Sequence, residues 1–335
     1  MRFGATILDA EGLRLTTEEK ALFRDVNPFG FILFARNVES ADQVRALCAD
    51  FREAVDRDCL ITIDQEGGRV QRLRQPLARE WLPPLEHVER AGAAAERAMY
   101  LRYRLIAHEL HDLGIDSNCA PMADLAQAET HPFLRNRCYG SNTEVVAGLA
   151  RATAQAHLDG GVLPVLKHIP GHGRATQDSH YDLPHVTLDA KTLDQSDFEA
   201  FRQLNDLPMG MTAHLVYNAI DAAPATLSPV VMDLIRNQIG FDGLIMTDDI
   251  SMKALSGSLT DLSQSALAAG CDVILHCNGS FAERAETARA AGEMSEIAQE
   301  RAERALAMRQ TPQPLDTDAA DAELSALMGG QVYDG

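Results

Sequence analysis

The chain alternates short apolar runs with longer amphipathic ones, and this alternation constrains its fold more than any other feature. The apolar runs are rich in β-forming residues, as in strands that are covered on both faces. They are ATILDA (5–10), FGFILF (29–34), CLITID (59–64), IDSNCAPMAD (115–124), VLPVLKH (162–168), MGMTAH (209–214), GLIMTDD (243–249) and CDVILHC (271–277). Strands that alternate with helices predict βα units and a parallel sheet.

The amphipathic runs carry signals for the ends of helices. Thr16 and Glu19 are spaced as a capping box at the start of one helix. The run over residues 85–113 predicts one long helix that ends at Gly114. Helices of this kind between the apolar runs support the βα assignment.

Seven or eight βα units in one chain predict an α/β fold, a TIM-like (β/α)8 barrel in a single domain. A doubly wound dinucleotide-binding sheet is disfavoured, because no GxGxxG fingerprint follows the first strand. We expect the barrel to occupy residues 1–310. The acidic, proline-interrupted segment 311–335 is expected to be a loosely docked or disordered tail.

Composition narrows the possible partners and the compartment. The formal net charge of −19 argues against nucleic acid or an anionic membrane surface as the main partner. The six cysteines are scattered without a CxxC pair or zinc spacing, so we expect them to be buried thiols. The start of the chain has no long apolar segment, and the cytoplasm is the expected compartment.

Ionisable residues stand at the ends of the apolar runs. The carboxyl ends of barrel strands converge on one face of a barrel, which is where substrates bind. We therefore expect these residues to share a site. They are Asp64, Asp124, Lys167, His168, His214, Asp248, Asp249 and His276.

Metal and phosphate binding are two chemistries that this set of residues permits. Several side chains have the donor atoms of metal ligands, but HExxH and a strand-end HxH are absent. The glycine-rich turn after Lys167 resembles a phosphate loop, but GxxxxGK[ST] is absent as well. We expect no metal. The candidate ligands for the metal hypothesis are His168, His172, His180 and His214 with Asp64 or Asp248.

Glycoside hydrolysis is the third chemistry. A retaining mechanism needs a nucleophilic carboxylate and a separate group that transfers a proton. Asp248 follows an apolar strand and can serve as the nucleophile. In the tripeptide Asp178-Ser179-His180, the carboxylate can orient the imidazole and tune it for proton transfer. The same tripeptide also suits a loop aspartate that caps a turn beside a surface histidine.

Four segments together resemble glycoside hydrolase family 3, and specifically its single-domain bacterial β-N-acetylhexosaminidases. The segments occur in the order found in the family, and the resemblance covers roughly residues 1–310. Several motifs at consistent spacing are far more specific than any one of them. They are IDQEGGRVQRL (63–73), NCAPMADL (118–125), KHIPGHG with DSH (167–180) and MTDDISM (246–252).

The resemblance implies a TIM-like barrel with a retaining two-step mechanism and no cofactor. It assigns the nucleophile to Asp248 and the acid/base function to His180, with Asp178 as the partner of the histidine. It also implies a set of residues that bind N-acetylglucosamine. These are Asp64, Arg72, Arg137, Lys167 and His168.

The implied substrate is a small carbohydrate, a muropeptide with a terminal β-1,4-linked N-acetylglucosamine, cleaved by a monomer during cytoplasmic peptidoglycan recycling. Neither nucleic acid nor a membrane is an implied partner. A family 3 phosphorylase or N-acetylglucosaminidase that acts on chitooligosaccharides stays open, as does a β-glucosidase. A sugar-binding barrel without catalysis is the alternative from another class.

Overall fold

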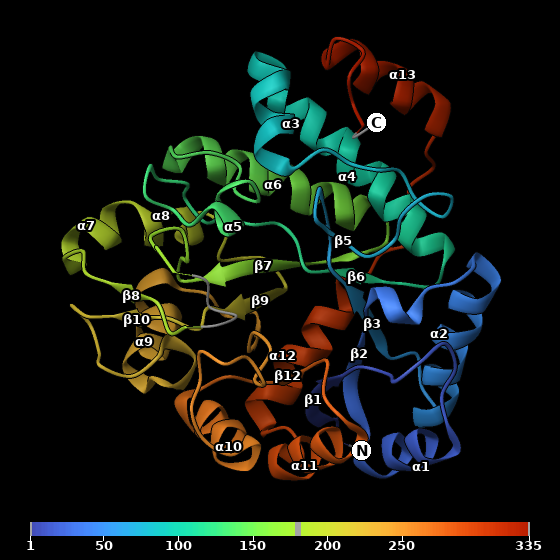
Figure 1. Cartoon of the computed structure of the whole chain (residues 1–335), viewed down its shortest axis with the longest axis vertical. Helices are drawn as coiled ribbons and strands as arrows, with labels where there is room; N and C mark the ends of the chain where they lie inside the picture. Colours follow the sequence, from blue (N-terminus) through green and yellow to red (C-terminus); the bar gives the residue numbers. More distant parts are fainter. Residues whose placement is uncertain (1, 178–181, 334–335) are drawn as a thin grey trace.

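The chain forms a parallel β-barrel surrounded by helices, as the alternation in its sequence predicts (Figure 1). The computed structural model describes residues 2–177 and 182–333. Within these residues the eight barrel strands are β1 (Gly4–Leu8), β2 (Pro28–Leu33), β3 (Leu60–Ile63), β6 (Ser117–Asn118), β7 (Leu163–Ile169), β9 (Met209–Thr212), β11 (Leu244–Met246) and β12 (Ile274–His276).

Backbone pairing closes these strands into a barrel. Four strands pair in the order β12-β1-β2-β3 and four in the order β11-β9-β7-β6, and all of the pairs are parallel. The N–H of Cys119 donates to the carbonyl of Ile63 at 2.8 Å, which joins β6 to β3. A parallel bridge between Met246 and Val273 joins β11 to the segment before β12. The predicted TIM-like (β/α)8 barrel is confirmed.

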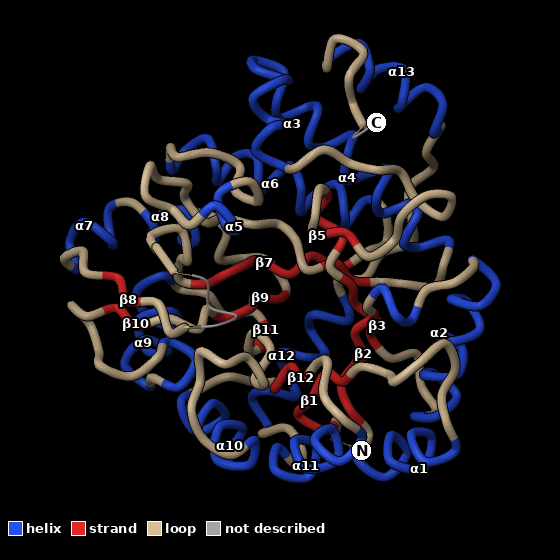
Figure 2. The backbone as a smooth tube through the Cα atoms, in the orientation of Figure 1, coloured by secondary structure: helices blue, strands red, loops and turns tan. Residues whose placement is uncertain are grey.

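Helices cover the outside of the barrel (Figure 2). Phe31 of β2 stacks on Phe51 at 4.1 Å and meets Phe23 edge-on at 4.9 Å, which fixes two helices over this strand. The helices are α1 (Thr17–Val26), α2 (Ala41–Val55), α3 (Pro84–Ala91), α4 (Ala95–Asp112), α5 (Pro132–Arg135), α6 (Thr143–Asp159), α7 (Ala190–Gln195), α8 (Asp197–Arg202), α9 (Pro229–Asp233), α10 (Leu259–Ala269), α11 (Phe281–Ala291), α12 (Glu296–Ala307) and α13 (Thr317–Leu327).

Shorter elements lie in the connections. An antiparallel hairpin of β4 (Gln65–Gly67) and β5 (Val70–Gln71) follows β3. A small parallel pair joins β8 (His185–Val186) to β10 (Val216–Tyr217). The single-turn helices are η1 (Ala35–Asn37), η2 (Gly92–Ala94) and η3 (Ala225–Leu227), and the π-helical turn η4 (Leu234–Ile239) continues α9.

The observed ends of the helices can be compared with the capping and termination signals in the sequence. The capping box of Thr16 and Glu19 is present at the start of α1 and is confirmed. The single long helix predicted over residues 85–113 is wrong, because the chain divides there into α3 and α4. Gly92 ends α3 with a φ of 52°, a left-handed conformation that glycine adopts without strain and that interrupts an α-helix.

The segment after residue 310 differs from its expected loosely docked or disordered state. It contains α13, which lies beside α4 near the C-terminus in Figure 1. The buried apolar side chains that hold this segment in place lie on α13 and in the residues that follow it, and the two on α13 are one helical turn apart. The buried side chains are Ala320, Leu324, Met328 and Val332. The boundary at residue 310 itself stays a prediction.

Two further features concern composition. All six cysteines are buried as free thiols, as expected from their apolar surroundings. No helix in the described ranges has the length and apolar character that a membrane crossing requires.

Candidate active site

A cavity of about 350 Å³ lies at the carboxyl ends of the barrel strands. Six of the eight site residues predicted from the sequence line it, although they come from different parts of the chain. These six are Asp64, Arg72, Arg137, Lys167, His168 and Asp248. Asp178 and His180, the other two, lie outside the described residues, and Gln177 just before them lines the cavity. The structure thus brings the predicted sugar-binding set and the predicted nucleophile together, while their roles stay predictions.

Asp64 follows β3 and accepts hydrogen bonds from two cations. The Lys167 ammonium donates to its Oδ1 at 3.0 Å, and the Arg72 guanidinium donates to its Oδ2 at 3.0 Å. Burial by itself would raise the pKa of Asp64, but Lys167 and Arg72 outweigh burial and hold it well below its usual range. Asp64 is therefore a fixed anionic acceptor on the cavity wall.

Glu66 forms a buried ion cluster behind this wall. Arg137 grips the Glu66 carboxylate with two parallel hydrogen bonds of 2.9 and 2.8 Å. Lys167 lies 2.5 Å from the same carboxylate. Burial alone would raise the pKa of Glu66, yet Arg137 and Lys167 lower it to about 2. Glu66 thus orients two of the predicted sugar-binding residues.

Asp124 orients two histidines from below the cavity. Its carboxylate, which is fully buried, lies 2.7 Å from Nδ1 of His168 and accepts the backbone N–H of His172 at 2.5 Å. The His168 and His172 rings stand 5.4 Å apart and both line the cavity. Burial and the nearby His168 lower the pKa of His172 to about 4, so this ring is neutral at neutral pH. Asp124 does not line the cavity itself but holds two residues that do.

Asp248 follows β11 and faces the cavity as a half-buried carboxylate. Among the described residues it accepts one hydrogen bond, from the N–H of Asp249 at 2.8 Å. Burial would raise the pKa of Asp248, but His214 and His168 outweigh it and lower the pKa below its ordinary value. The carboxylate is therefore ionised and open on the cavity side, as a nucleophile must be.

Asp249 has a different environment from its neighbour. Its Oδ1 accepts hydrogen bonds from the N–H of Ser251 at 3.0 Å and the N–H of Cys277 at 3.2 Å, so it holds the loop after β11 against β12. Burial raises the pKa of Asp249 to about 6. His214 contacts the Asp249 carbonyl at 3.0 Å. An orienting role for Asp249, rather than a second nucleophile, agrees with these contacts.

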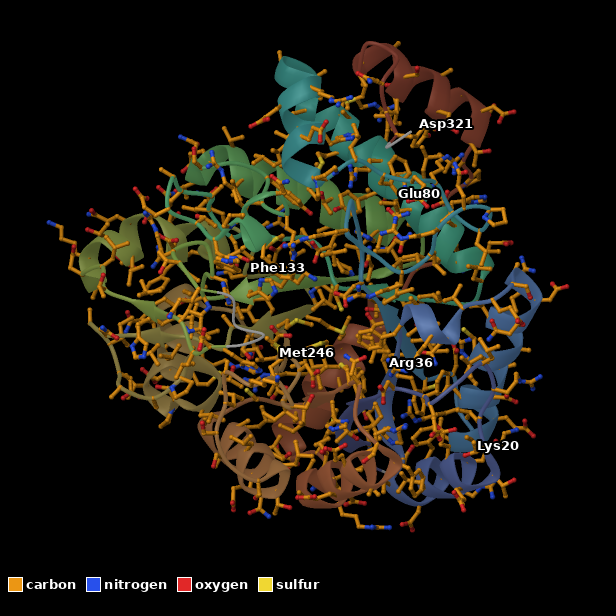
Figure 3. All side chains as sticks on the ribbon, viewed as in Figure 1. Lys20, Arg36, Glu80, Phe133, Met246 and Asp321 are labelled. Carbon is orange, nitrogen blue, oxygen red and sulfur yellow. The ribbon has the colours of Figure 1, made fainter. Side chains whose placement is uncertain are left out.

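Several cavity residues were not found from the sequence. Arg69 stacks over the Phe133 ring at 3.5 Å, and Figure 3 labels Phe133 in α5 and Met246 in β11 near the centre of the view. Asn278, just after β12, has a φ of 60° and donates its N–H to Asp9 at 2.6 Å. The glycine pair before Arg69 and the position of Asn278 after an apolar run are the sequence signals that could have identified them. His276 is buried but does not line the cavity, although its neighbours Leu275 and Cys277 do, and burial lowers its pKa to about 4.

An ionised carboxylate that faces a polar cavity at the mouth of a barrel is the arrangement of a TIM-barrel glycoside hydrolase. Comparison with known proteins agrees. The profile of the glycosyl hydrolase family 3 N-terminal domain matches residues 6–308. A β-hexosaminidase of Alkalilimnicola ehrlichii is 36% identical over 285 residues, which cover 83% of this chain and 82% of that protein. One of Pseudomonas aeruginosa (strain LESB58) is 37% identical over 279 residues, with 82% of each covered.

Solved structures show the same relationship. NagZ from Neisseria gonorrhoeae in complex with N-trifluoroacetyl-D-glucosamine superposes with a TM-score of 0.80 at 29% identity, over 98% of this chain and 99% of that one. A family 3 β-N-acetylglucosaminidase from Paenibacillus sp. str. FPU-7 gives 0.85 at 28% identity, over 96% of this chain and 66% of that longer chain. This chain therefore belongs to glycosyl hydrolase family 3. It is a glycoside hydrolase of the β-hexosaminidase type.

Proposed function

We propose that the chain is a retaining β-N-acetylhexosaminidase that removes terminal non-reducing N-acetylglucosamine from β-1,4-linked muropeptides in peptidoglycan recycling. The ionised carboxylate of Asp248, open to a cavity that also holds Asp64 and Lys167, supports this proposal most strongly. The complex of the Neisseria NagZ with N-trifluoroacetyl-D-glucosamine adds support, because its ligand is an N-acylated glucosamine.

The proposed reaction has two steps. Asp248 attacks the anomeric carbon, the glycosidic bond breaks, and His180 gives its proton to the departing oxygen. His180 then removes a proton from water, which attacks the same carbon and releases the sugar and the Asp248 carboxylate. Asp178 orients the imidazole of His180 throughout. The roles of His180 and Asp178 rest on the family motif, because both lie outside the described residues.

A histidine suits this site for an electrostatic reason. Asp64, Glu66 and Asp248 already place carboxylates at or behind the cavity wall. A further carboxylate as the base would be repelled by Asp248 as both became ionised, and its pKa would rise. An imidazole avoids this cost and titrates near neutrality.

Sugar recognition follows from the donors and acceptors that line the cavity. Asp64 accepts hydrogen bonds from sugar hydroxyls, while Arg72, Lys167 and His168 donate to hydroxyl or acetamide oxygens. Arg137 acts largely through Glu66, because two of its donors are already bonded to that carboxylate. The proposed substrate implies a cytoplasmic enzyme, and six free cysteines suit that reducing compartment. We also propose that the enzyme is a monomer.

One set of assays tests the proposed reaction. p-Nitrophenyl N-acetyl-β-glucosaminide and the corresponding glucoside are compared as substrates, each with and without phosphate and with and without a chelator. We expect hydrolysis of the N-acetylglucosaminide, little of the glucoside, and no dependence on phosphate or chelator. Sugar 1-phosphate formed with phosphate would indicate a phosphorylase. Loss of activity in the presence of a chelator would indicate a metal enzyme. The absence of turnover with either substrate would indicate a sugar-binding protein without catalysis.

The acid/base assignment has its own test. His180→Ala is expected to lose most of the turnover, by a factor of about 10² to 10⁴, while the protein stays folded. The measurement is kcat on the N-acetylglucosaminide, with circular dichroism as the check on folding. Full activity in this variant would refute the assignment of His180.

A further inference from the structure

The segment between β3 and α3 forms one wall of the cavity. Asp64, Arg69, Val70 and Arg72 of this segment line the cavity. Residues 65–71 of this segment form the β4–β5 hairpin, whose strands are only three and two residues long. An isolated two-stranded hairpin is at best marginally stable. The position of this wall therefore depends on contacts from outside the hairpin.

Trp81 supplies two of those contacts through its backbone. Its carbonyl accepts the N–H of Gly68 at 2.7 Å, and its own N–H donates to Oε1 of Gln71 at 3.2 Å. Gly68 and Gln71 are the immediate neighbours of the cavity residues Arg69 and Arg72. A displacement of Trp81 is therefore passed directly to two side chains of the cavity wall.

The C-terminal segment holds Trp81 from the other side. Tyr333 forms an antiparallel bridge with Trp81, and the two rings meet edge-on at 5.2 Å. Asp321 on α13 accepts hydrogen bonds from the Arg79 guanidinium at 2.6 and 3.1 Å, and also from the Tyr333 hydroxyl. Figure 3 labels Asp321 on α13 and Glu80, which stands between Arg79 and Trp81. These contacts leave the indole 1% exposed.

We propose that residues 317–333, which we term the C-terminal clamp, position the β4–β5 hairpin for substrate binding, with Tyr333 and Asp321 as positioning residues. The proposal rests on the proposed function in so far as the hairpin binds sugar. The family profile ends at residue 308, so the clamp lies beyond the matched part of the chain.

The clamp should affect binding more than chemistry. The Arg72 guanidinium on the clamped wall lies 3.0 Å from Asp64, and a loosened hairpin changes that geometry. Asp248 instead follows β11, which is paired with β9 inside the barrel and makes no contact with the clamp among the described residues. Misplaced binding groups weaken substrate binding, while a correctly placed nucleophile still reacts.

Three variants and one control test this proposal. Tyr333→Ala removes the ring that covers Trp81, Tyr333→Phe keeps the ring without its hydroxyl, and Asp321→Ala releases Arg79. Glu323→Ala is the matched control, because Glu323 lies on the same helix and pairs only with the exposed Arg97. Trp81 is the single tryptophan of the chain, so its fluorescence reports the state of the clamp directly.

Tyr333→Ala is expected to raise KM for the N-acetylglucosaminide about tenfold, with kcat within about twofold and a red-shifted Trp81 emission. Tyr333→Phe should keep the emission of the wild type with a smaller rise in KM. Asp321→Ala should fall between these two variants, and Glu323→Ala should match the wild type. If Tyr333→Ala does not fold, the other two variants carry the test.

Other outcomes overturn the proposal. A red-shifted emission with unchanged KM would mean that the clamp covers Trp81 without positioning the hairpin. If Glu323→Ala lowered kcat and raised KM as much as Tyr333→Ala does, the effect would come from a general loss of stability. If the wild type cleaves no N-acetylglucosaminide, the proposed function fails instead. In that case, amide hydrogen exchange of residues 65–73 tests independently whether the clamp positions the hairpin. We expect faster exchange in Tyr333→Ala than in the wild type.

Discussion

Asp116 and Asp248 lie at opposite ends of the barrel and differ in how far the protein bonds their carboxylates. At the amino ends of the strands, Asp116 accepts the N–H of Ile61 at 2.7 Å and pairs with Arg52 and Arg309. At the carboxyl ends, the Asp248 carboxylate has one hydrogen bond among the described residues and faces a cavity. The protein therefore bonds both oxygens of Asp116, whereas Asp248 differs even from the other aspartates at its own end of the barrel. Asp64, Asp124 and Asp249 each accept at least two hydrogen bonds.

Asp272 repeats the pattern of the amino ends. Its Oδ2 accepts the N–H of Ile245 at 2.9 Å and the Arg236 guanidinium at 2.7 Å, and its Oδ1 accepts Arg301 at 3.1 Å. Both oxygens of this aspartate are thus used to link a strand to the surrounding helices. Sparse hydrogen bonding among the described residues, rather than burial or charge, therefore distinguishes Asp248 from the other aspartates at both ends of the barrel.

The largest expected effect is at Asp248. Asp248→Asn removes the nucleophile without changing the size of the side chain, so we expect kcat/KM to fall by about 10⁴-fold or more. The free energy of unfolding should change little, because the carboxylate makes few contacts. Steady-state kinetics and urea denaturation measure the two quantities.

Asp249→Asn is the matched control for that variant. The amide oxygen can still accept the hydrogen bonds from Ser251 and Cys277, so we expect less than about a tenfold loss of kcat/KM. Comparable losses at both positions would mean that the two adjacent aspartates do not differ as their environments indicate.

Asp272→Asn should show the opposite behaviour. Loss of the charge leaves Arg236 and Arg301 without their buried partner, so we expect a loss of about 3 kcal/mol in the free energy of unfolding. The kcat/KM of the folded enzyme should stay within about twofold. Asp206→Asn, which breaks an exposed pair with Arg151, is the control and should cost at most about 1 kcal/mol. A large fall in kcat/KM without loss of stability in Asp272→Asn would contradict the division between the two ends.

The acid stability of the enzyme should depend on Glu66. The pKa of Glu66 is lowered from 4.5 to about 2 in the fold, where Arg137 and Lys167 outweigh burial. Its stabilisation, on the order of 3 kcal/mol, is therefore full above pH 4.5 and is lost as the pH falls through about 2. Asp249, with a pKa raised by burial to about 6, acts in the opposite direction and favours the fold as the pH falls below that value.

Urea denaturation between pH 2 and pH 6 measures this dependence. The free energy of unfolding of Glu66→Gln should fall less steeply with acid than that of the wild type over the interval from 4.5 to 2. Identical slopes would show that Glu66 is not held ionised by its two cations.

The barrel could be predicted from the sequence because its signal is local. Each strand is an apolar run of the right length, and the capping box of Thr16 stands three residues from its partner Glu19. Strand-end positions also placed Asp64 and Lys167 on one face, although 103 residues separate them. Topology alone carried that prediction, because parallel barrel strands end at the same face.

The missed features depend on partners that lie far away in the sequence. The docked C-terminal segment was hidden by its acidic composition, yet Ala320, Leu324 and Met328 recur at intervals of four, a helical spacing that favours one buried face. The sequence does not show that α4 and Trp81 provide the surface against which this segment packs. The break at Gly92 was missed because apolar periodicity continues on both sides of it.

The central claim is that Asp248 is the nucleophile of a retaining glycosidase. It is tested most directly by incubating the enzyme with 5-fluoro-N-acetylglucosaminyl fluoride, followed by intact-protein mass spectrometry and peptide mapping. We expect one covalent adduct, formed with release of fluoride, that maps to Asp248 and is absent from Asp248→Asn. An adduct on any other residue, or turnover of the substrate with inversion at the anomeric carbon, would contradict it.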